Sequence, residues 1–275
     1  MSIRSSSLLI LLALPLLAGG AHAYSFKTEV PLLNGERVPA YCFMPDYQIK
    51  SSLPAVICSV GVGATKIVQY HVHCQYLANR HFFVLLIDPS NHPESLAPGP
   101  YEWDRMPGYA LGSVNQVWVG AKLFFGIEWY LEAIRAAVDH VCRFPQVDAR
   151  RIALSGFSQP ANAALTYACR DPRIGCVVWN YGGWPWIMPY DPARLPPVLI
   201  FHGDADAVYD VKYAVELAGK LRAANRCFEM YIYPGQDHMF TTYYDLHTET
   251  PAMRPALLDS FERLVSFLYR KLPPS

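Results

Sequence analysis

The stretch "RIALSGFSQPANAALTYA", from Arg151 to Ala168, joins a short apolar run to a run of small residues through a Gly-x-Ser turn. An apolar run, a tight turn and a series of alanines predict a buried strand that passes directly into a helix. Ser158 stands at this turn, where a nucleophilic serine is often mounted. A glycine usually follows two residues after such a serine, but here that position holds Pro160. The stretch predicts a strand–turn–helix unit and raises the question of whether its serine is reactive.

Strand-like and helix-like segments alternate along most of the chain. Six short runs that are apolar on both faces predict strands buried between two layers of helices, at residues 54–60, 82–88, 151–156, 174–180, 197–203 and 228–235. Helical patterns lie at residues 64–80, 127–143, 159–170, 211–224 and 254–272. This order predicts an α/β fold with a mostly parallel central sheet and helices on both faces. Before it, residues 26–45 predict an antiparallel hairpin that turns at Asn34-Gly35.

Residues 89–126 do not fit this alternation. They contain scattered proline, glycine and aromatic residues, and they follow the carboxyl end of a predicted strand. Ligands of open α/β sheets bind at that edge, and a loop of this length inside a compact domain is usually functional. We therefore expect residues 89–126 to form a lid or a wall of the binding pocket.

The first 23 residues have the pattern of a signal peptide. Arg4 supplies a positive charge, residues 8–17 form an apolar run too short to span a bilayer, and the tripeptide "AHA" at 21–23 is a small-x-small cleavage site. The alternative is a membrane anchor that stays attached. We expect cleavage before Tyr24, a secreted or periplasmic location, and one domain formed by residues 24–275.

Composition limits the partners. Basic and acidic residues are balanced at 23 each, which gives no reason to expect nucleic acid or an anionic membrane as a partner.

The seven cysteines are an odd number, so at least one is unpaired within the chain. Cys58 has the surroundings of a buried small residue, whereas Cys169 and Cys176 flank a helix-to-strand turn and are candidates for a disulfide. His71 and His73 lie two apart on a predicted helix, so they face different directions and indicate no metal site.

A reactive serine needs a histidine to take its proton and an acid to orient that histidine. On a parallel sheet these groups arrive at the carboxyl ends of strands. Ser158 follows "RIALSGF", Asp206 follows "PVLIFHGDA" and His238 follows "FEMYIYPGQD". The order Ser, Asp, His along the chain is that of α/β-hydrolases.

With these stretches the sequence resembles an α/β-hydrolase of the dienelactone-hydrolase-like group, which is also similar to the catalytic domains of acyl-aminoacyl peptidases. The matching segments are "GFSQP", "FHGDADAVYDVKYAVELAGKLRAA" and "YPGQDHMF", and "LNGERVPAYCFMP" resembles the entry hairpin of the group. The resemblance implies an α/β-hydrolase fold, with Ser158 as nucleophile, Asp206 as orienting acid and His238 as base. The namesake enzymes carry cysteine as nucleophile, so the serine here favours ordinary esters over dienelactones.

Pro160 is compatible with a reactive serine. It falls in the first helical turn, where N–H groups have no intrahelical partner and proline is tolerated. The oxyanion hole needs the N–H of the residue after the serine, Gln159, which is retained. A second donor is expected from the loop after residues 54–60, where the N–H of Val62 is favoured and that of Gly61 comes next. The histidine that the family often has in this loop is absent.

Other polar residues near the predicted site have structural interpretations. Asp204 is the alternative acid, but the resemblance assigns that role to the second aspartate of the turn, which leaves Asp204 to brace it. His202 ends an apolar strand and is interpreted as a buried, hydrogen-bonded histidine. Asp237 is interpreted as a residue that shapes the turn before the base.

Aromatic residues gather in the loops that follow the predicted strands. Trp103 of the predicted lid and Trp184 and Tyr181 of the segment "NYGGW" are candidates for an aromatic wall of the substrate pocket. The alternative for these residues is ordinary core and loop packing. Trp129 and Tyr130 lie in a predicted helix and are expected to face the core.

Together these observations predict an exported serine hydrolase that cleaves carboxylic esters of small molecules through an acyl-enzyme. We expect no metal, no cofactor, and neither nucleic acid nor a membrane as partner. Two alternatives stay open, a serine peptidase or amidase of the same fold and a ligand-binding homologue that has lost the reaction. Pro160 and the missing oxyanion histidine are the features that favour such a homologue.

Overall fold

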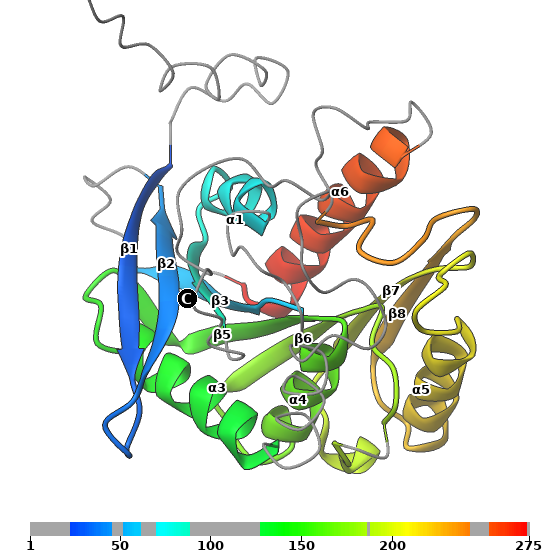
Figure 1. Ribbon diagram of the computed structural model, residues 1–275, viewed down its shortest axis with the longest axis horizontal. Coiled ribbons are helices and arrows are strands. Elements are labelled where there is room, and N and C mark those ends of the chain that lie inside the picture. Colours follow the sequence, from blue (N-terminus) through cyan, green and yellow to red (C-terminus); the bar gives the residue numbers. More distant parts are fainter. Residues whose placement is uncertain are drawn as a thin grey trace, which may run out of the picture.

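The computed structural model describes residues 23–45, 52–61, 70–88, 127–185, 188–242 and 253–273. Residues 1–22 of the expected signal peptide and the whole expected lid, residues 89–126, lie outside these ranges. The described residues form an eight-stranded sheet with the strand order β1-β2-β4-β3-β5-β6-β7-β8 (Figure 1). The strands are β1 (Tyr24–Pro31), β2 (Arg37–Met44), β3 (Leu53–Ser59), β4 (Phe83–Ile87), β5 (Val147–Phe157), β6 (Ile174–Asn180), β7 (Val198–Gly203) and β8 (Phe228–Tyr233).

Most neighbouring strands are parallel. β4, β3, β5, β6, β7 and β8 pair in parallel from one to the next, whereas β2 pairs antiparallel with both β1 and β4. The turn of the β1–β2 hairpin contains Gly35 at φ +85°, a conformation that glycine adopts without strain. The N–H of Glu36 donates to Oδ1 of Asn34 at 3.0 Å. The predicted fold class, a mostly parallel sheet with an antiparallel entry hairpin, is confirmed.

Helices cover both faces of the sheet (Figure 1). Those on one face are α1 (His71–Ala78) and α6 (Met253–Lys271), and those on the other are α3 (Ile127–Val141), α4 (Gln159–Ala168) and α5 (Lys212–Ala223). Successive strand residues point to opposite faces, so β3 places Ala55 and Ile57 in one core and Val56 and Cys58 in the other. Within the described residues, no helix combines the length and apolar character needed to cross a membrane.

β8 differs from the predicted burial pattern. Its sequence is apolar on both faces, yet five of its six residues are partly exposed. The reason is its place at the edge of the sheet, where it has a neighbouring strand on one side only. The strand ends at Tyr233, and Gly235, at φ +69°, begins the turn that leads to His238.

The candidate disulfide between Cys169 and Cys176 is not formed, because all seven cysteines are free thiols. Cys176 is buried inside β6. The Sγ of Cys169 lies 3.2 Å from the carbonyl oxygen of Asp191. Cys58 is fully buried in β3, as predicted.

β5 and α4 meet at a turn that has no space for a side chain at Gly156. A Cβ at this position would lie 2.5 Å from the carbonyl oxygen of Pro160 and from Cα of Ala161, and both are backbone atoms. Every residue of α4 is buried, and small residues follow Pro160 on the helix. Pro160 lies in the first turn of α4, where its missing N–H removes no intrahelical hydrogen bond.

Replacement of Gly156 by alanine is expected to destabilise the protein. The added Cβ would force β5 away from α4, and overpacking of this kind typically costs about 1–3 kcal/mol. Because the opposing atoms are backbone and cannot turn aside, we expect Gly156→Ala to lower the free energy of unfolding by about 3 kcal/mol. Urea denaturation followed by circular dichroism measures this difference.

Gly219→Ala is the matched control. No atom lies within 4 Å of a Cβ added at Gly219, which is in the middle of α5. Alanine is favoured over glycine in a helix by about 0.5–1 kcal/mol, so this variant should be at least as stable as the wild type. Equal stability of Gly156→Ala and the wild type would show that β5 and α4 are not in close contact.

Candidate active site

Three side chains form a hydrogen-bonded chain at the carboxyl edge of the sheet. Ser158 follows β5, Asp206 follows β7 and His238 follows β8. Oγ of Ser158 lies 3.0 Å from Nε2 of His238, and Nδ1 of His238 lies 2.8 Å from Oδ2 of Asp206. The structure therefore brings together the three residues that the sequence proposes as nucleophile, base and acid.

The turn between β5 and α4 holds Ser158 in a strained conformation, at φ +60° and ψ −133°. Its N–H donates to the carbonyl oxygen of Asn180 at 3.0 Å, and the Asn180 side-chain amide donates to the carbonyl oxygen of Gly156 at 2.9 Å. The end of β6 thus fixes the turn from both sides. Positive φ angles at non-glycine residues cost about 1–3 kcal/mol and cluster at functional sites.

Strained residues also follow β6 and β8. Six non-glycine residues of the described chain have positive φ angles, and four of them, Ser158, Tyr181, Trp184 and Met239, lie in or beside this site. Such a concentration is typical of a site whose geometry is imposed by the surrounding structure.

The side chain of Asp206 is buried, and both of its carboxylate oxygens are hydrogen-bonded. Oδ1 accepts from the backbone N–H groups of Val208 and Tyr209, each at 2.8 Å. Oδ2 contacts His238 and also lies 3.2 Å from Nε2 of His202. Burial alone would raise the pKa of Asp206, but the hydrogen bonds from His202, His238 and the Tyr209 backbone outweigh it and hold the pKa well below its ordinary value. Asp206 is therefore an anion at neutral pH.

His202 supports the acid, which is more than the sequence analysis assigned to it. Its side chain is fully buried, and Nε2 lies 2.8 Å from the carbonyl oxygen of Tyr209 as well as near Asp206. Since both neighbours are acceptors, Nε2 carries the proton and donates to them. Nδ1 is buried without a hydrogen-bond partner among the described residues.

The two other aspartates shape the turns around the triad. Oδ1 of Asp204 accepts from the N–H of Gly235 at 2.6 Å and joins the turn after β7 to the turn after β8. Oδ1 of Asp237 accepts from the N–H groups of Ala207 and His238, at 3.0 and 2.7 Å. Neither carboxylate has a hydrogen bond to the imidazole of His238 within the described part of the chain, so Asp206 is the acid in contact with it.

Backbone donors near Ser158 differ in their availability. The N–H of Gln159 has no hydrogen-bond partner among the described residues. The N–H of Gly61 donates to the hydroxyl of Tyr70 at 2.8 Å, although a Cβ at Gly61 would come within 3.4 Å of Cβ of Ser158. Val62 lies outside the described residues. Tyr70 was not recognisable as a site residue from the sequence, because its position before α1 carries no motif.

The aromatic residues proposed for the pocket wall have different positions. Tyr181 is fully buried under the base, with its ring centroid 4.8 Å from that of His238, and its hydroxyl is 3.2 Å from those of Thr241 and Thr242. Tyr181 thus supports the imidazole and offers no exposed surface to a substrate. Trp184 is 38% exposed and lies beside the site. Trp103 lies outside the described residues.

Tyr209 is a site residue that the sequence analysis missed. Its ring is edge-on to His238, with centroids 5.5 Å apart, and to Trp184 at 5.1 Å. Its hydroxyl donates to Oε1 of Gln159 at 3.1 Å. The available signal was its place three residues after Asp206, in the same turn.

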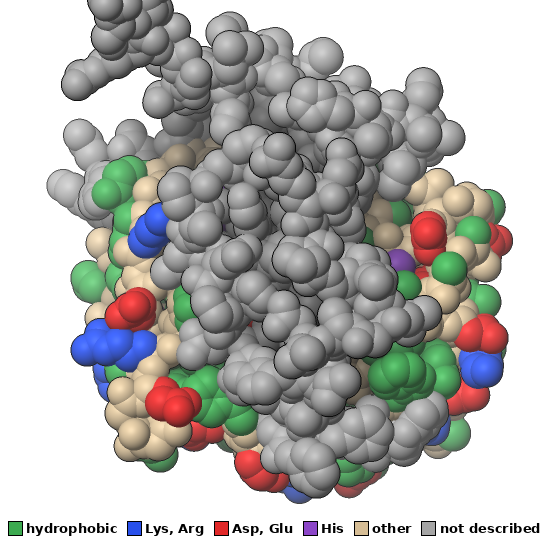
Figure 2. Space-filling view, viewed as in Figure 1, with side chains coloured by type: hydrophobic (Ala, Val, Ile, Leu, Met, Phe, Trp, Pro, Cys, Tyr) green, Lys and Arg blue, Asp and Glu red, His purple; other side chains and the backbone are tan. Residues whose placement is uncertain are grey.

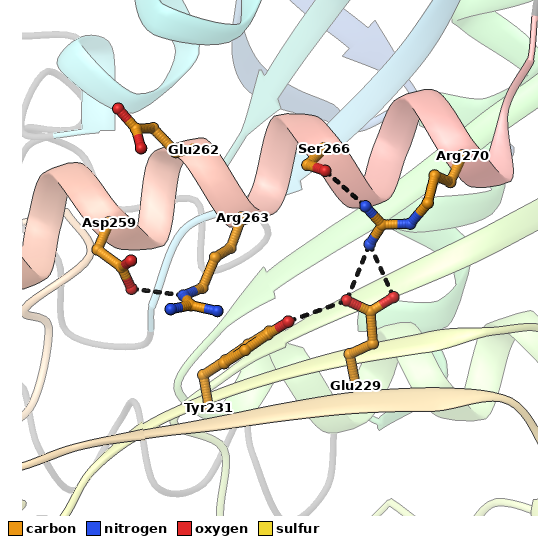
Figure 3. Close-up of a pocket in the computed structure, with 7 residues that line it drawn as sticks. All are labelled: Glu229, Tyr231, Asp259, Glu262, Arg263, Ser266 and Arg270. Carbon is orange, nitrogen blue, oxygen red and sulfur yellow. Dashed lines mark hydrogen bonds and ion pairs between the residues drawn. The ribbon is translucent and has the colours of Figure 1, made fainter.

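A separate open pocket lies between β8 and α6 and has a cavity volume of about 260 Å³ (Figure 3). Arg263 pairs there with Asp259 at 2.5 Å, and Arg270 pairs with Glu229 at 2.8 Å. Glu229 lies at the start of β8, whereas His238 follows its end, so this pocket is remote from the triad. Its paired charges offer no arrangement of nucleophile and base.

Within the described residues, neither surface charge on the face drawn in Figure 2 nor metal-ligand geometry points to another kind of site. On the face drawn in Figure 2, acidic and basic side chains are interspersed around the described surface. Among the described residues, no group of three or more His, Cys, Asp or Glu side chains is arranged to hold a metal ion.

A mostly parallel sheet with a Ser–His–Asp chain at its carboxyl edge defines the α/β-hydrolase class. The model of the dienelactone hydrolase family matches residues 120–272, a range that contains all three of these side chains. The chain therefore belongs to the dienelactone hydrolase family. A comparison with curated proteins finds no match.

Solved structures show the same fold. A protein described as a dienelactone hydrolase from Klebsiella pneumoniae subsp. pneumoniae MGH 78578 is 20% identical, with a TM-score of 0.69 over 90% of this chain and 99% of that one. A dienelactone hydrolase-like promiscuous phosphotriesterase from metagenomic libraries is 17% identical, with a TM-score of 0.67 over 91% and 99%. An acylaminoacyl peptidase is 12% identical, with a TM-score of 0.67 over 92% of this chain but 42% of that one.

Asp206→Asn is expected to destabilise the protein in a pH-dependent way. Because the folded-state pKa of Asp206 is lowered, its carboxylate adds stability above the ordinary carboxyl range, and this stability is lost as pH falls toward the folded-state pKa. We expect the variant to be less stable than the wild type by about 2 kcal/mol at pH 7, with a difference that shrinks below about pH 4. Urea titrations at several pH values measure it.

Glu216→Gln, at an exposed position of α5, provides the control for removal of a carboxylate. This variant should keep a stability close to that of the wild type from pH 7 to pH 3, because Glu216 is exposed and makes no hydrogen bond or ion pair within the described part of the chain. A difference between Asp206→Asn and the wild type that stays constant from pH 7 to pH 3 would contradict the assignment of a stabilised anion.

Proposed function

We propose that this protein is a serine hydrolase that cleaves carboxylic esters of small molecules through an acyl-enzyme. The observation that carries the proposal is the continuous hydrogen-bonded chain from Ser158 through His238 to Asp206. Membership of a hydrolase family supports it. A serine in place of the cysteine of the namesake enzymes favours ordinary esters as substrates.

In the acylation step, Oγ of Ser158 forms a bond to the acyl carbon and its proton passes to Nε2 of His238, 3.0 Å away. The carbonyl π electrons move to the carbonyl oxygen, which becomes the oxyanion. Asp206 holds the imidazole in the tautomer whose Nε2 is free to accept, and it stabilises the imidazolium that results. The bond to the leaving alcohol then breaks, and the alcohol takes the proton from Nε2.

Deacylation repeats these steps with water. A water molecule attacks the acyl carbon and gives a proton to Nε2 of His238. The bond between Oγ of Ser158 and the acyl carbon breaks, and Oγ recovers the proton as the carboxylic acid leaves. One water is consumed for each ester, and the balance requires no cofactor.

Backbone N–H groups are the proposed stabilisers of the oxyanion. The N–H of Gln159 follows the nucleophile and has no partner among the described residues, which supports its role as first donor. The N–H of Val62 is the proposed second donor. The N–H of Gly61 can act as a donor only if it breaks its hydrogen bond to the hydroxyl of Tyr70 and donates to the substrate oxygen instead.

Cleavage of amides is the second candidate function. Its support is the similarity of fold to an acylaminoacyl peptidase. This chain covers 42% of that peptidase. We favour esters because alkoxide leaving groups are easier to expel than amines.

An alkyl fluorophosphonate probe tests for an activated serine. We expect it to label the wild type and to give no label on Ser158→Ala or His238→Ala, because one variant lacks the nucleophile and the other lacks the base. Hydrolysis of short 4-nitrophenyl esters should fall by about 10³-fold or more in both variants. Labelling is read by gel fluorescence and intact mass.

Ser266→Ala, at an exposed position of α6, controls for surface labelling and should label like the wild type. A folded wild-type protein that takes no label would overturn the proposal and favour the ligand-binding alternative. Faster turnover of matched 4-nitroanilides than of the esters would favour the amidase.

We further propose that the protein is exported and that residues 1–23 are removed. The support is the charged start, short apolar run and small-x-small site of this segment. After expression of the full chain in a bacterial host, mass spectrometry of the secreted or periplasmic product should find Tyr24 as the first residue. The variant Ala23→Arg should block cleavage, and an uncleaved cytosolic product from the wild type would contradict the proposal.

A further inference from the structure

Beside the triad, Gln159 and Tyr209 form a polar pair that the proposed reaction does not use. The hydroxyl of Tyr209 donates to Oε1 of Gln159 at 3.1 Å, and both side chains are buried. Burial raises the pKa of Tyr209 well above its ordinary value, so the phenol stays protonated. The pair is therefore a neutral donor–acceptor unit in contact with the nucleophile.

The side-chain nitrogen of Gln159 lacks an acceptor. Nε2 is buried and has no hydrogen-bond partner among the described residues, while Oε1 is occupied by Tyr209. Buried N–H groups without acceptors lower stability and are rare in native proteins, so each one requires an explanation. A group of this kind next to a reactive serine is explained if its acceptor arrives with the substrate.

The surrounding residues hold the ring of Tyr209 in place. The ring of Tyr209 packs against the backbone of Gly183 so closely that a Cβ at Gly183 would overlap it. Trp184 and His238 meet the same ring from two further directions, with centroids 5.1 and 5.5 Å away. Gln159 is fully buried at the start of α4. The donor is thus held in place before a substrate enters, which is how specific polar recognition is achieved.

We propose that Nε2 of Gln159 binds an oxygen atom of the acyl group, so that the site selects esters with an ether, hydroxyl or carbonyl oxygen a few bonds from the scissile carbonyl. The inference rests on the proposed ester hydrolysis. Because Gln159 also offers its backbone N–H to the oxyanion, its side chain begins beside the reacting carbonyl. Tyr209 is a positioning residue that orients the amide. A site with a buried donor discriminates against analogues that leave the donor unpaired.

A pair of esters of equal length provides the test. 4-Nitrophenyl methoxyacetate and 4-nitrophenyl butyrate differ by one ether oxygen in place of a methylene group. Each kcat/KM is divided by the rate constant of hydroxide-catalysed hydrolysis of the same ester, which removes the difference in intrinsic reactivity. For the wild type we expect this normalised ratio to favour methoxyacetate by about tenfold or more.

Three variants separate the donor from the shape of the site. Gln159→Met keeps the backbone N–H and the approximate volume but has no side-chain donor, so the normalised ratio should fall close to one. Gln159→Glu keeps the shape and presents a carboxylate oxygen, so the ratio should turn in favour of butyrate. Tyr209→Phe removes the hydroxyl that orients the amide, and the ratio should fall to an intermediate value.

Two matched controls change the same residue types elsewhere. Gln75→Met is on α1, where the Gln75 amide bonds to Asn79, and Tyr231→Phe is on β8, where the hydroxyl bonds to Glu229. Both variants should keep the wild-type ratio. Each variant is also labelled at Ser158 with the fluorophosphonate probe. Because this probe has no acyl group, its reaction does not depend on binding of an acyl oxygen, and labelling confirms that the variant is folded and reactive.

The outcomes distinguish this inference from the proposed function. A wild type that is labelled and hydrolyses both esters with a normalised ratio near one overturns the inference and leaves the esterase intact. A preference that survives in Gln159→Met also overturns it, because the oxygen would then be bound by another group. A wild type that is neither labelled nor active on either ester removes the esterase and the inference together.

Discussion

The geometry of the site depends on the close approach of two backbone segments, the end of β5 and the first turn of α4. No side chain fits between them at Gly156, so the chain has to reverse direction within two residues. Ser158 absorbs that reversal with a positive φ angle, and its N–H and the preceding turn are both hydrogen-bonded to Asn180 of β6. The hydroxyl is therefore presented at the carboxyl edge of the sheet, where it meets Nε2 of His238.

A second close contact sets the other half of the site. The turn after β7 packs against the turn after β8 so tightly that a Cβ at Gly203 would overlap the backbone of Gln236. The N–H of Ala205 donates to the carbonyl oxygen of Gln236 at 3.1 Å, and Asp204 bonds to Gly235. Because these two turns carry the acid and the base, their contact determines the distance between Asp206 and His238.

The sequence was most informative where one physical rule controls the structure. Strands such as β3 and β6 are buried on both faces and so have continuous apolar runs, which located them to within one residue. The three triad positions follow from the rule that functional groups stand after such strands. β8 has the same apolar composition, but its exposure depends on its place at the edge of the sheet, which no local pattern records.

The residues whose roles the sequence did not reveal act through contacts that depend on the three-dimensional path of the loops. His202 was recognisable as buried, yet its bond to Asp206 arises from the fold of the turn after β7, and the support of His238 by Tyr181 joins the loops after β6 and β8. The candidate pairing of Cys169 with Cys176 failed for the same reason, since nearness in sequence does not determine where two thiols point.

Tyr209 links the two halves of the site more directly than any triad residue. Its backbone N–H holds Asp206, its carbonyl oxygen accepts from His202, and its hydroxyl reaches Gln159 at the start of α4. A shift of the turn after β7 therefore moves the phenol, and with it the side chain of Gln159 next to Ser158. The orientations of the His238 imidazole and of the Gln159 side chain are thus coupled through one buried side chain, whose ring packs so closely against Gly183 that no Cβ fits there.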